Sequence, residues 1–436
     1  MATLKAVRGA RDLLPPETEL WNRIEATARR VFARYNFGEI RTPIFEDTAL
    51  FARSVGEDTD IVSKEMYTWE DRARAQSEKA QSLTLRPENT AGVVRAYIEH
   101  KLGESGQLQK LYYIGPQFRR ERPQKGRYRQ FWQIGAEAIG PPSSGSESPL
   151  RDAEVLEMLA TLLDELGIKD WTLELNSVGS AADRARYNDV LRAALAEVAP
   201  KMCVDCQRRA VTNPLRVLDC KVPGDQPIIE TLPRIGESLG EDSKEHFAAV
   251  TEALDAAGVE YKLNSRLVRG LDYYTRTTFE FTHGGLGAQN ALLGGGRYDG
   301  LSEALGGPRA PGIGFAMGLD RLVMTLQAAE QVVPQRAAMD SKCDAYIAPL
   351  GENLNAAALV LARELRRARL SVELGDGSFR LKKSFEAADK AARCIVILGE
   401  DELQSGILTV KEFATGKQTK VPRAELAGFL AGPGRE

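Results

Sequence analysis

Polar and apolar side chains alternate along the segment Tyr128–Ile139, which we predict to be a strand. Successive side chains of a strand point to opposite faces of its sheet. One face carries apolar residues suited to a core: Trp132, Ile134, Ala136 and Ala138. The other face mixes polar heads with a glycine: Phe131, Gln133, Gly135 and Glu137. Because a glycine weakens a strand unless something approaches closely, the mixed face predicts a ligand pocket, although a solvent-facing strand has the same pattern.

A strongly basic segment precedes this strand. The thirteen residues Gln117–Arg129 contain six Arg or Lys and one Glu. They follow a second predicted strand, Lys110–Gly115, so we expect an antiparallel hairpin with a basic tip. Arg119 and Glu121 share a face of that preceding strand, and the Arg119 guanidinium could bind a phosphate or a carboxylate through two parallel hydrogen bonds. A solvated basic surface accounts for the same charges, and both interpretations remain open.

An arginine also interrupts the apolar segment Leu267–Thr275, which we predict to begin a strand that runs to Thr282. A buried guanidinium such as that of Arg269 needs an anionic partner, which could be a ligand or a structural carboxylate such as Asp272. The paired tyrosines of this segment, at 273 and 274, are typical of a core or an interface.

The glycine run at 294–300 matches neither a dinucleotide-binding fingerprint nor a phosphate-binding P-loop. If a nucleotide binds, arginine side chains must therefore replace backbone amides as its phosphate partners. Arg321 is a candidate, because it lies on the helix predicted after Phe315.

Three of the five cysteines lie near one another in the sequence, as Cys203-x-x-Cys206 and Cys220. Structural zinc normally has four ligands, and the nearest histidine is His246. We therefore predict no metal site and expect reduced, partly buried thiols. The low, odd cysteine count makes a disulfide framework improbable and fits a reducing cytosol.

Length and composition bound the class of protein. The 436 residues suggest roughly three domains at about 150 residues each. A hydrophobic share of 43% and a charged share of 27% are ordinary for a globular protein. No apolar run approaches the about 18 residues of a membrane span, and the first residues lack a signal peptide, so we predict a cytoplasmic protein with no membrane partner. The net charge of −3 does not exclude nucleic acid, which needs only a local basic face.

The order of the predicted elements gives an α+β organisation. We predict a helix at 17–36 and an edge strand at 39–43, where Pro43 removes a ladder donor. The mainly antiparallel domain spans 1–177 and 259–330, with a helical insertion at 178–258. A linker at 331–341 leads to a smaller α/β domain at 342–436, where predicted strands and helices alternate.

Taken together, these segments resemble a histidyl-tRNA synthetase, a member of the class II aminoacyl-tRNA synthetases. The likeness runs from Arg8 to the tail, and three segments carry it most specifically: Thr84–Glu88, Phe118–Phe131 and Leu267–Tyr274. The resemblance implies a ligase that activates L-histidine with ATP and Mg²⁺ and then charges tRNA(His). It also implies a class II catalytic domain and an anticodon-binding tail. The tail from Ser341 on has 15 Lys/Arg and 13 Asp/Glu, a difference of +2 that is compatible with RNA.

The resemblance assigns roles to the residues that matched. For ATP it implies Arg119 at the α-phosphate, Glu121 at the adenine amino group, Phe131 stacked on the ring, and Arg127 and Arg321 at the terminal phosphates. For histidine it implies a pocket of nine residues: Glu88, Thr90, Arg119, Gln133, Glu137, Arg269, Tyr273, Tyr274 and Tyr298. Within that pocket, Glu137 and Tyr274 would read the imidazole nitrogens, and Arg269 and Arg119 would be catalytic. Arg122 and Gln124 would approach the acceptor end of tRNA.

The resemblance further implies a homodimer, with the helix and strand that end at Pro43 in the interface, and no DNA partner. One position departs from the family, which usually has Gly where Asn89 stands. Asn tolerates a left-handed backbone better than most residues, so we expect the loop to survive.

Two other proteins share parts of this pattern. A regulatory subunit of ATP phosphoribosyltransferase has the same catalytic fold but is expected to lack the anticodon domain and parts of the motifs. Arg119, Arg269, Arg321 and a full tail argue against it here. A synthetase of the same subclass for glycine, proline or threonine is disfavoured by the segment 267–275.

Overall fold

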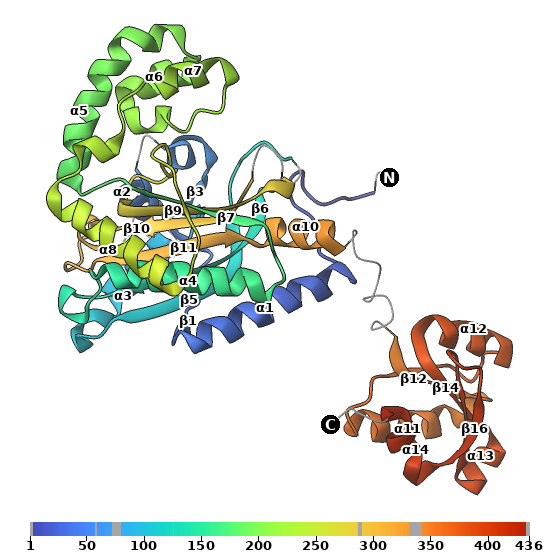
Figure 1. Cartoon of the computed structure of the whole chain (residues 1–436). Coiled ribbons are helices and arrows are strands. Elements are labelled where there is room, and N and C mark those ends of the chain that lie inside the picture. Colours follow the sequence, from blue (N-terminus) through green and yellow to red (C-terminus); the bar gives the residue numbers. More distant parts are fainter. Residues whose placement is uncertain are drawn as a thin grey trace. The chain divides into compact units, whose positions relative to one another are not determined.

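The computed structural model describes residues 3–56, 59–71, 80–124, 126–286, 290–330 and 342–432. The chain forms two compact units, Met1–Val332 and Val333–Glu436, and each is described by itself (Figure 1). The predicted linker at 331–341 lies outside the described residues. In the described part of the chain, no helix combines the length and the apolar character needed to cross a membrane.

The first unit is built on an eight-stranded sheet. In spatial order its strands are β1 (Gly38–Glu39), β5 (Gln109–Phe118), β6 (Gln130–Ile139), β11 (Gly312–Gly318), β10 (Ala291–Arg297), β9 (Thr275–His283), β7 (Trp171–Ser177) and β8 (Lys262–Leu263). Only the pairs at the two ends, β1–β5 and β7–β8, are parallel. A smaller antiparallel sheet consists of β2 (Phe45–Asp47), β4 (Gln81–Leu85) and β3 (Tyr67–Asp71). The predicted antiparallel hairpin is confirmed as β5–β6.

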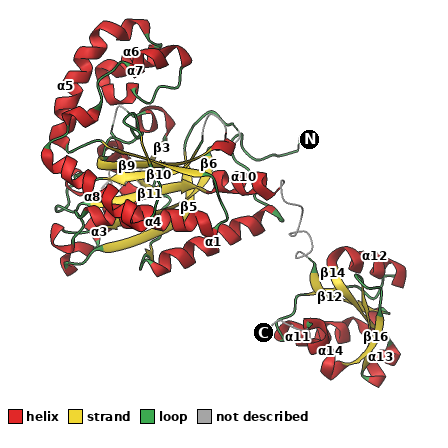
Figure 2. Cartoon of the chain, viewed as in Figure 1, coloured by secondary structure: helices red, strands yellow, loops and turns green. Residues whose placement is uncertain are grey.

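Helices of the first unit cover the sheet and extend beside it. Their bounds are α1 (Glu17–Arg34), α2 (Thr48–Val55), α3 (Thr90–Glu99), α4 (Pro149–Glu165), α5 (Ala181–Val198), α6 (Val204–Thr212), α7 (Gln226–Glu230), α8 (Glu241–Ala257), α9 (Leu301–Ala304) and α10 (Leu319–Glu330). Figures 1 and 2 show α1, α4 and α8 along one side of the large sheet. Their buried apolar side chains, such as Ile24, Leu159 and Val250, join those of the strands in one core.

Two predicted strands differ from the structure. The strand expected at 39–43 ends at Glu39, and Pro43 without its N–H lies beyond it. The strand expected from Leu267 begins only at Thr275. The residues before it form a loop whose N–H groups bond elsewhere: Leu267 N donates to Asn264 O at 2.9 Å, and Asp272 N to Val55 O at 3.3 Å. With its donors engaged in this way, the segment does not join the strand ladder.

The helical segment has a core of its own. Side chains between Val178 and Leu239, together with Val268, form a separate buried cluster that includes Cys206 and Cys220. Figure 1 shows α5, α6 and α7 gathered beside the sheet. By contrast, Leu254 on α8 belongs to the core of the large sheet. The boundary of the insertion at 258 stays a prediction, and the cores suggest that the separate body ends before α8.

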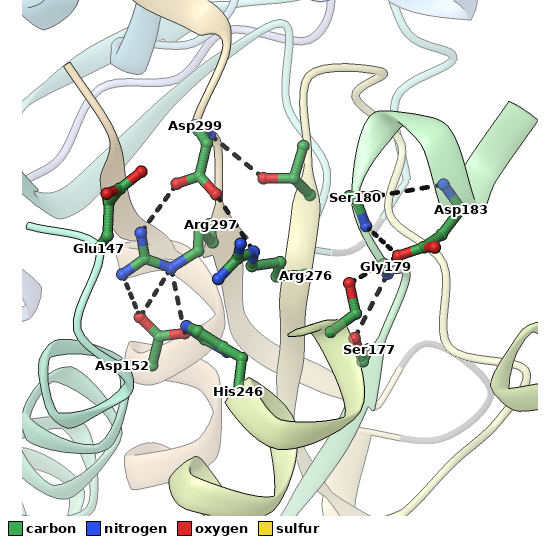
Figure 3. Close-up of polar contacts among 12 residues, drawn as sticks. Glu147, Asp152, Ser177, Gly179, Ser180, Asp183, His246, Arg276, Arg297 and Asp299 are labelled. Carbon is green, nitrogen blue, oxygen red and sulfur yellow. Dashed lines mark hydrogen bonds and ion pairs between the residues drawn. The ribbon is translucent and has the colours of Figure 1, made fainter. Parts of the chain in front are cut away.

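A buried ion-pair network ties β10 to α4 (Figure 3). Arg297 and Asp152 are both fully buried, and Nη2 of Arg297 donates to Asp152 Oδ1 at 2.8 Å. Nη1 of Arg297 donates to Asp299 Oδ1 at the same distance. His246, on α8, places Nε2 3.6 Å from Asp152 Oδ2. The network therefore joins three elements of the core.

The second unit contains a five-stranded sheet in the order β13 (Val372–Leu374), β12 (Cys343–Pro349), β14 (Ala392–Leu398), β15 (Ile407–Glu412) and β16 (Gln418–Pro422). Its helices are α11 (Asn355–Arg367), α12 (Leu381–Ala391), α13 (Glu400–Ser405) and α14 (Leu426–Ala431). The predicted alternation of strands and helices is confirmed. Sequence patterns missed α13 and β16, which are short.

Candidate active site

The first unit holds a cavity of about 730 Å³ over the face of the large sheet. Eleven predicted site residues line it: Glu88, Thr90, Arg119, Glu121, Arg127, Phe131, Gln133, Arg269, Tyr273, Tyr274 and Arg321. They come from segments far apart in the sequence: the β4–α3 loop, the β5–β6 hairpin, the loop before β9, and α10. Of the face of β6 predicted to border a pocket, Phe131 and Gln133 line the cavity, and Gly135 and Glu137 do not.

Four arginines of the cavity are oriented by protein acceptors. Nε of Arg119 donates to Pro87 O at 2.9 Å, and its guanidinium lies 5.3 Å from the ring centre of Phe131. Nη1 of Arg127 contacts Glu121 Oε2 at 3.0 Å. Burial, and after it the charge of Arg127, lower the pKa of Arg321. Such crowding of positive charge is favourable only when an anion offsets it.

Arg269 lies against β10, the strand that carries the glycines at 294–296. Its Nη1 forms an ion pair with Glu280 on β9. A Cβ atom at Gly294 would stand 2.5 Å from Nη2 of Arg269, closer than any real contact. The glycine run at 294–300, which matches no nucleotide-binding motif, thus makes room for the guanidinium. Burial lowers the pKa of Arg269, but Glu280 outweighs this effect and the pKa is raised.

Glu137 and Tyr298, both predicted for the histidine pocket, lie behind the cavity rather than among its lining residues. Both are buried, with 0% and 1% exposure. Thr90 Oγ1 donates to Glu137 Oε1 at 2.7 Å, and the Tyr298 hydroxyl lies close enough to interact with the same carboxyl group. Burial raises the pKa of Glu137 to about 8. A Cβ atom at Gly314 would stand 1.7 Å from Oε2, so this carboxyl also depends on a glycine.

Glu88 sits at the start of α3. Its two carboxylate oxygens accept hydrogen bonds from the N–H groups of Thr90, at 2.7 Å, and Ala91, at 3.0 Å. A carboxylate at a helix N-terminus is stabilised by these free donors. Burial nevertheless raises the pKa of Glu88 above its ordinary value. The acid is therefore held firmly in place at the edge of the cavity.

The basic loop departs from its prediction in detail. Strand β5 ends at Phe118, so Arg119 and Glu121 lie in the loop and not on a strand face. Within the loop, Gln124 and Arg127 form an isolated bridge. Arg122 and Gln124, predicted for tRNA, are exposed and do not line the cavity.

Asn89 has an ordinary backbone, with φ −122°, so its tolerance of a left-handed conformation is not needed. Its Oδ1 accepts hydrogen bonds from Thr42 Oγ1 at 2.6 Å and from Nη1 of Arg86 at 3.3 Å. The side chain that replaces the family's glycine therefore has a structural environment of its own.

Sequence patterns missed several polar residues of the molecule. Glu280 interrupts the apolar alternation of β9, a signal that could have revealed it. Asn290 and Arg266 line the cavity without such a signal. In the helical body, Asp225 lies beside the three cysteines, and its carboxylate supplies the fourth group that the sequence pattern lacked.

An antiparallel sheet that gathers arginines from a hairpin loop and from later segments around one cavity has the architecture of a class II aminoacyl-tRNA synthetase. Comparison with known proteins defines the family within that class. A family model described as histidyl-tRNA synthetase matches residues 9–322, and one described as anticodon binding domain matches residues 344–432. The chain belongs to the histidyl-tRNA synthetase family, and its tail is an anticodon-binding domain.

Similar proteins cover nearly the whole chain. The histidine–tRNA ligase of Koribacter versatilis is 72% identical over 432 residues, which are 99% of this chain and 97% of that protein. The histidine–tRNA ligase of Solibacter usitatus is 55% identical over 98% of this chain and 99% of its own length. The crystal structure of apo S. aureus histidyl-tRNA synthetase has 37% identity and a TM-score of 0.79, and the likeness covers 98% of this chain and 100% of that one.

Proposed function

We propose that the chain activates L-histidine with ATP to form histidyl-adenylate and pyrophosphate, and then transfers the histidyl group to the 3′-terminal adenosine of tRNA(His). The observation that carries this proposal is one cavity that collects Arg119, Arg127, Arg269 and Arg321 beside the carboxyl group of Glu88. The arginines suit a polyanionic nucleotide, and the carboxyl suits the ammonium group of an amino acid.

The activation step brings two anions together. The histidine carboxylate attacks the α-phosphorus in line, and pyrophosphate leaves. Guanidinium groups of Arg119 and Arg269 offset the repulsion and the charge that develops on the phosphate oxygens. Arg127 and Arg321 hold the terminal phosphates, while Glu121 accepts from the adenine amino group and Phe131 stacks on the ring. The protein supplies position and charge and needs no nucleophile of its own.

ATP enters with Mg²⁺, which neutralises charge on the pyrophosphate side. Divalent magnesium prefers carboxylate oxygens, and Glu280 offers them on the wall of the cavity. Glu280 would hold the ion, although it now forms an ion pair with Arg269.

Histidine recognition rests on buried polar groups. Glu88 and Thr90 bind the α-amino group, Gln133 lies near the carboxylate, and Glu137 and Tyr274 read the imidazole nitrogens. Tyr273 and Tyr298 complete the pocket. Gln133 Oε1 has no hydrogen-bond partner among the described residues, which supports a polar ligand. A site that leaves such groups unpaired with a wrong side chain rejects it by about 10⁴–10⁵-fold.

The transfer step needs tRNA at the same cavity. Arg122 and Gln124 are exposed on the basic loop and would meet the acceptor end, while the tail domain meets the anticodon. Phosphate contacts of this kind weaken with salt, so charging should be more salt-sensitive than activation.

The protein acts in the cytoplasm as a homodimer. Next to Pro43, the side chains of Ile44, Phe45 and Trp69 are 44%, 54% and 41% exposed. Phe45 and Trp69 lie edge to face at 6.3 Å on the small sheet. Clustered apolar exposure of this kind supports an interface between two copies.

ATP–pyrophosphate exchange, measured with each of the twenty amino acids, tests the function. We expect exchange with histidine alone. A variant that lacks residues 342–432 should retain exchange and lose the charging of tRNA(His). Exchange with another amino acid, or none with histidine, would refute the proposal.

A further inference from the structure

A cluster of four potential metal ligands lies in the helical body and contains none of the residues assigned to catalysis. Cys203, Cys206, Cys220 and Asp225 each offer one ligand atom, and these atoms all lie within 4.8 Å of one another. Cys206, Cys220 and Asp225 are buried, and Cys203 is partly buried. The four residues converge from the start of α6, the loop after α6 and the residue before α7.

The spacing of the four ligand atoms suits an ion with tetrahedral coordination. Around zinc with Zn–S bonds of about 2.3 Å and Zn–O bonds of about 2.1 Å, neighbouring ligand atoms stand about 3.6–3.8 Å apart. Sγ of Cys203 lies 3.9 Å from Sγ of Cys220, and Sγ of Cys220 lies 3.2 Å from Asp225 Oδ2. These two pairs need shifts of a few tenths of an ångström, and a pair at the 4.8 Å limit of the set needs a shift of about 1 Å to complete the coordination.

Backbone groups hold the ligands in these positions. The N–H of Cys203 donates to both Asp225 oxygens, at 3.1 and 3.2 Å, and so fixes the carboxylate beside the thiols. The N–H of Val222 donates to Cys220 Sγ at 3.4 Å. Cys203 is the N-cap of α6 and Cys206 lies in its first turn, so the start of one helix carries two of the ligands.

The chemical nature of the four ligands determines which ion they bind. Soft thiolates bind zinc in preference to magnesium or calcium, which take oxygen ligands. The compact spacing fits a single ion, and an iron–sulfur cluster would need four thiolates or histidine replacements. A disulfide requires sulfurs about 2.05 Å apart, well below the 3.9 Å between Cys203 and Cys220.

We propose that Cys203, Cys206, Cys220 and Asp225 form a structural zinc site. This site stabilises the helical body, the segment between Val178 and Leu239 that has its own core. Cys206 and Cys220 already belong to the small core of this body, and small cores commonly rely on a metal for stability. With all four positions filled by protein, the ion has no open site and performs no catalysis.

The zinc site also fixes one wall of the active-site cavity. Asp219, Lys221 and Gln226 line the cavity and alternate in sequence with the ligands at 220 and 225. Nε2 of Gln226 donates to the Cys220 carbonyl at 2.7 Å, and Oε1 of Gln226 accepts from Nη2 of Arg266, also at 2.7 Å. The ion therefore holds the segment 219–226 against the loop that carries Arg269.

Metal content of the full-length protein tests the site directly. Wild-type protein, supplied with zinc and then desalted, should carry one zinc per chain by mass spectrometry. Cys203→Ser should lower the zinc affinity at least about tenfold, as measured by competition with a chromogenic chelator. Asp225→Ala should do the same, while Asp225→Cys should retain the ion because it restores a fourth ligand. Cys343→Ser, a tail cysteine outside the cluster, is the matched control and should keep one zinc.

Cobalt substitution makes the test independent of how the variants fold. Wild-type protein reconstituted with Co²⁺ should show the intense visible bands of a tetrahedral site and a thiolate charge-transfer band. Less than a tenth of an equivalent of zinc in wild-type protein would overturn the proposal. So would an octahedral cobalt spectrum, equal metal loss in Cys343→Ser, or a Cys203–Cys220 disulfide found without reduction.

Discussion

Two buried polar regions of the first unit differ in how completely their groups are paired. Around Arg297, the guanidinium donates to Asp152 and Asp299 (Figure 3). It also donates to the Ser146 carbonyl, so each of its nitrogens has an acceptor. In the active-site region, Gln133 Oε1 and Nε of Arg269 have no partner among the described residues. An unpaired buried polar group costs free energy, so the second region is built for a ligand that supplies the missing partners.

The pKa values of the buried charged groups show the same difference between the two regions. Burial lowers the pKa of Arg297, but Asp152 and Asp299 outweigh burial and raise it. The pKa of Glu137 is instead raised to about 8, because no cation compensates its burial. A fully paired charge is part of the scaffold, whereas an uncompensated one marks a place where a substrate must complete the electrostatics.

The largest expected effect is on catalysis. Arg269→Ala should reduce histidine-dependent ATP–pyrophosphate exchange by about 10³-fold, because a preorganised charge beside the reacting phosphate is lost. The thermal midpoint of unfolding should change little. Arg309→Ala, which removes an exposed arginine paired with Glu147, is the control and should exchange normally. If Arg269→Ala catalysed exchange at the wild-type rate, Arg269 would have no role in the mechanism.

A smaller loss, this time of stability, is expected in the paired region. Asp152→Asn should destabilise the first unit by about 3 kcal/mol, because it leaves the fully buried Arg297 charge without its main partner. All four tryptophans, at 21, 69, 132 and 171, lie in this unit, so their fluorescence reports its unfolding alone. Exchange per folded molecule should remain near wild type. If exchange fell while stability held, the network would belong to the active site.

The pH dependence of stability separates the two regions further. The native state keeps a proton on Glu137 that the unfolded chain releases between pH 4.5 and about 8. Its contribution to stability is therefore complete below the unfolded pKa and is lost as the pH rises through the folded one. Relative to Glu137→Gln, the free energy of unfolding of wild type should fall by about 1.4 kcal/mol per pH unit in this window.

Tryptophan-monitored urea unfolding at several pH values measures this slope. Glu88, whose pKa is also raised by burial, is present in both proteins, so the effect of its burial cancels and only its interaction with Glu137 remains in the comparison. If the stability of wild type and of Glu137→Gln changed with pH in parallel, Glu137 would be ionised in the native protein.

Periodic patterns predicted the scaffold and one wall of the site from the sequence. The alternation along β6 identified the face with Gln133 and Glu137, because the apolar face needs a core and the polar face does not. The cavity as a whole was not predictable from spacing, since Arg269 and Arg321 reach it through contacts between distant segments.

The errors also have physical causes. The segment before β9 has strand-like residues, but its N–H groups bond to Asn264 and Val55, partners that no local pattern reveals. Asp225 was missed because a carboxylate five residues after Cys220 has no typical ligand spacing. Both cases depend on tertiary contacts that override local propensity.

The smallest expected effect concerns Asn89, whose Oδ1 is paired with Thr42 and Arg86 and whose Nδ2 has no partner among the described residues. Asn89→Gly removes the acceptor of Thr42 Oγ1 and should cost about 1 kcal/mol of stability. Arg86 keeps its bonds to the carbonyls of Thr42 and Pro116, both at 3.0 Å, so its charge stays satisfied. No strain is relieved, since φ at this position is −122°. Exchange should change less than about twofold, because glycine at this site leaves Glu88 and its helix-start donors in place. If the KM for histidine rose far more than about twofold in Asn89→Gly, the Asn89 amide would order the site for the α-amino group and would not be simply a structural contact.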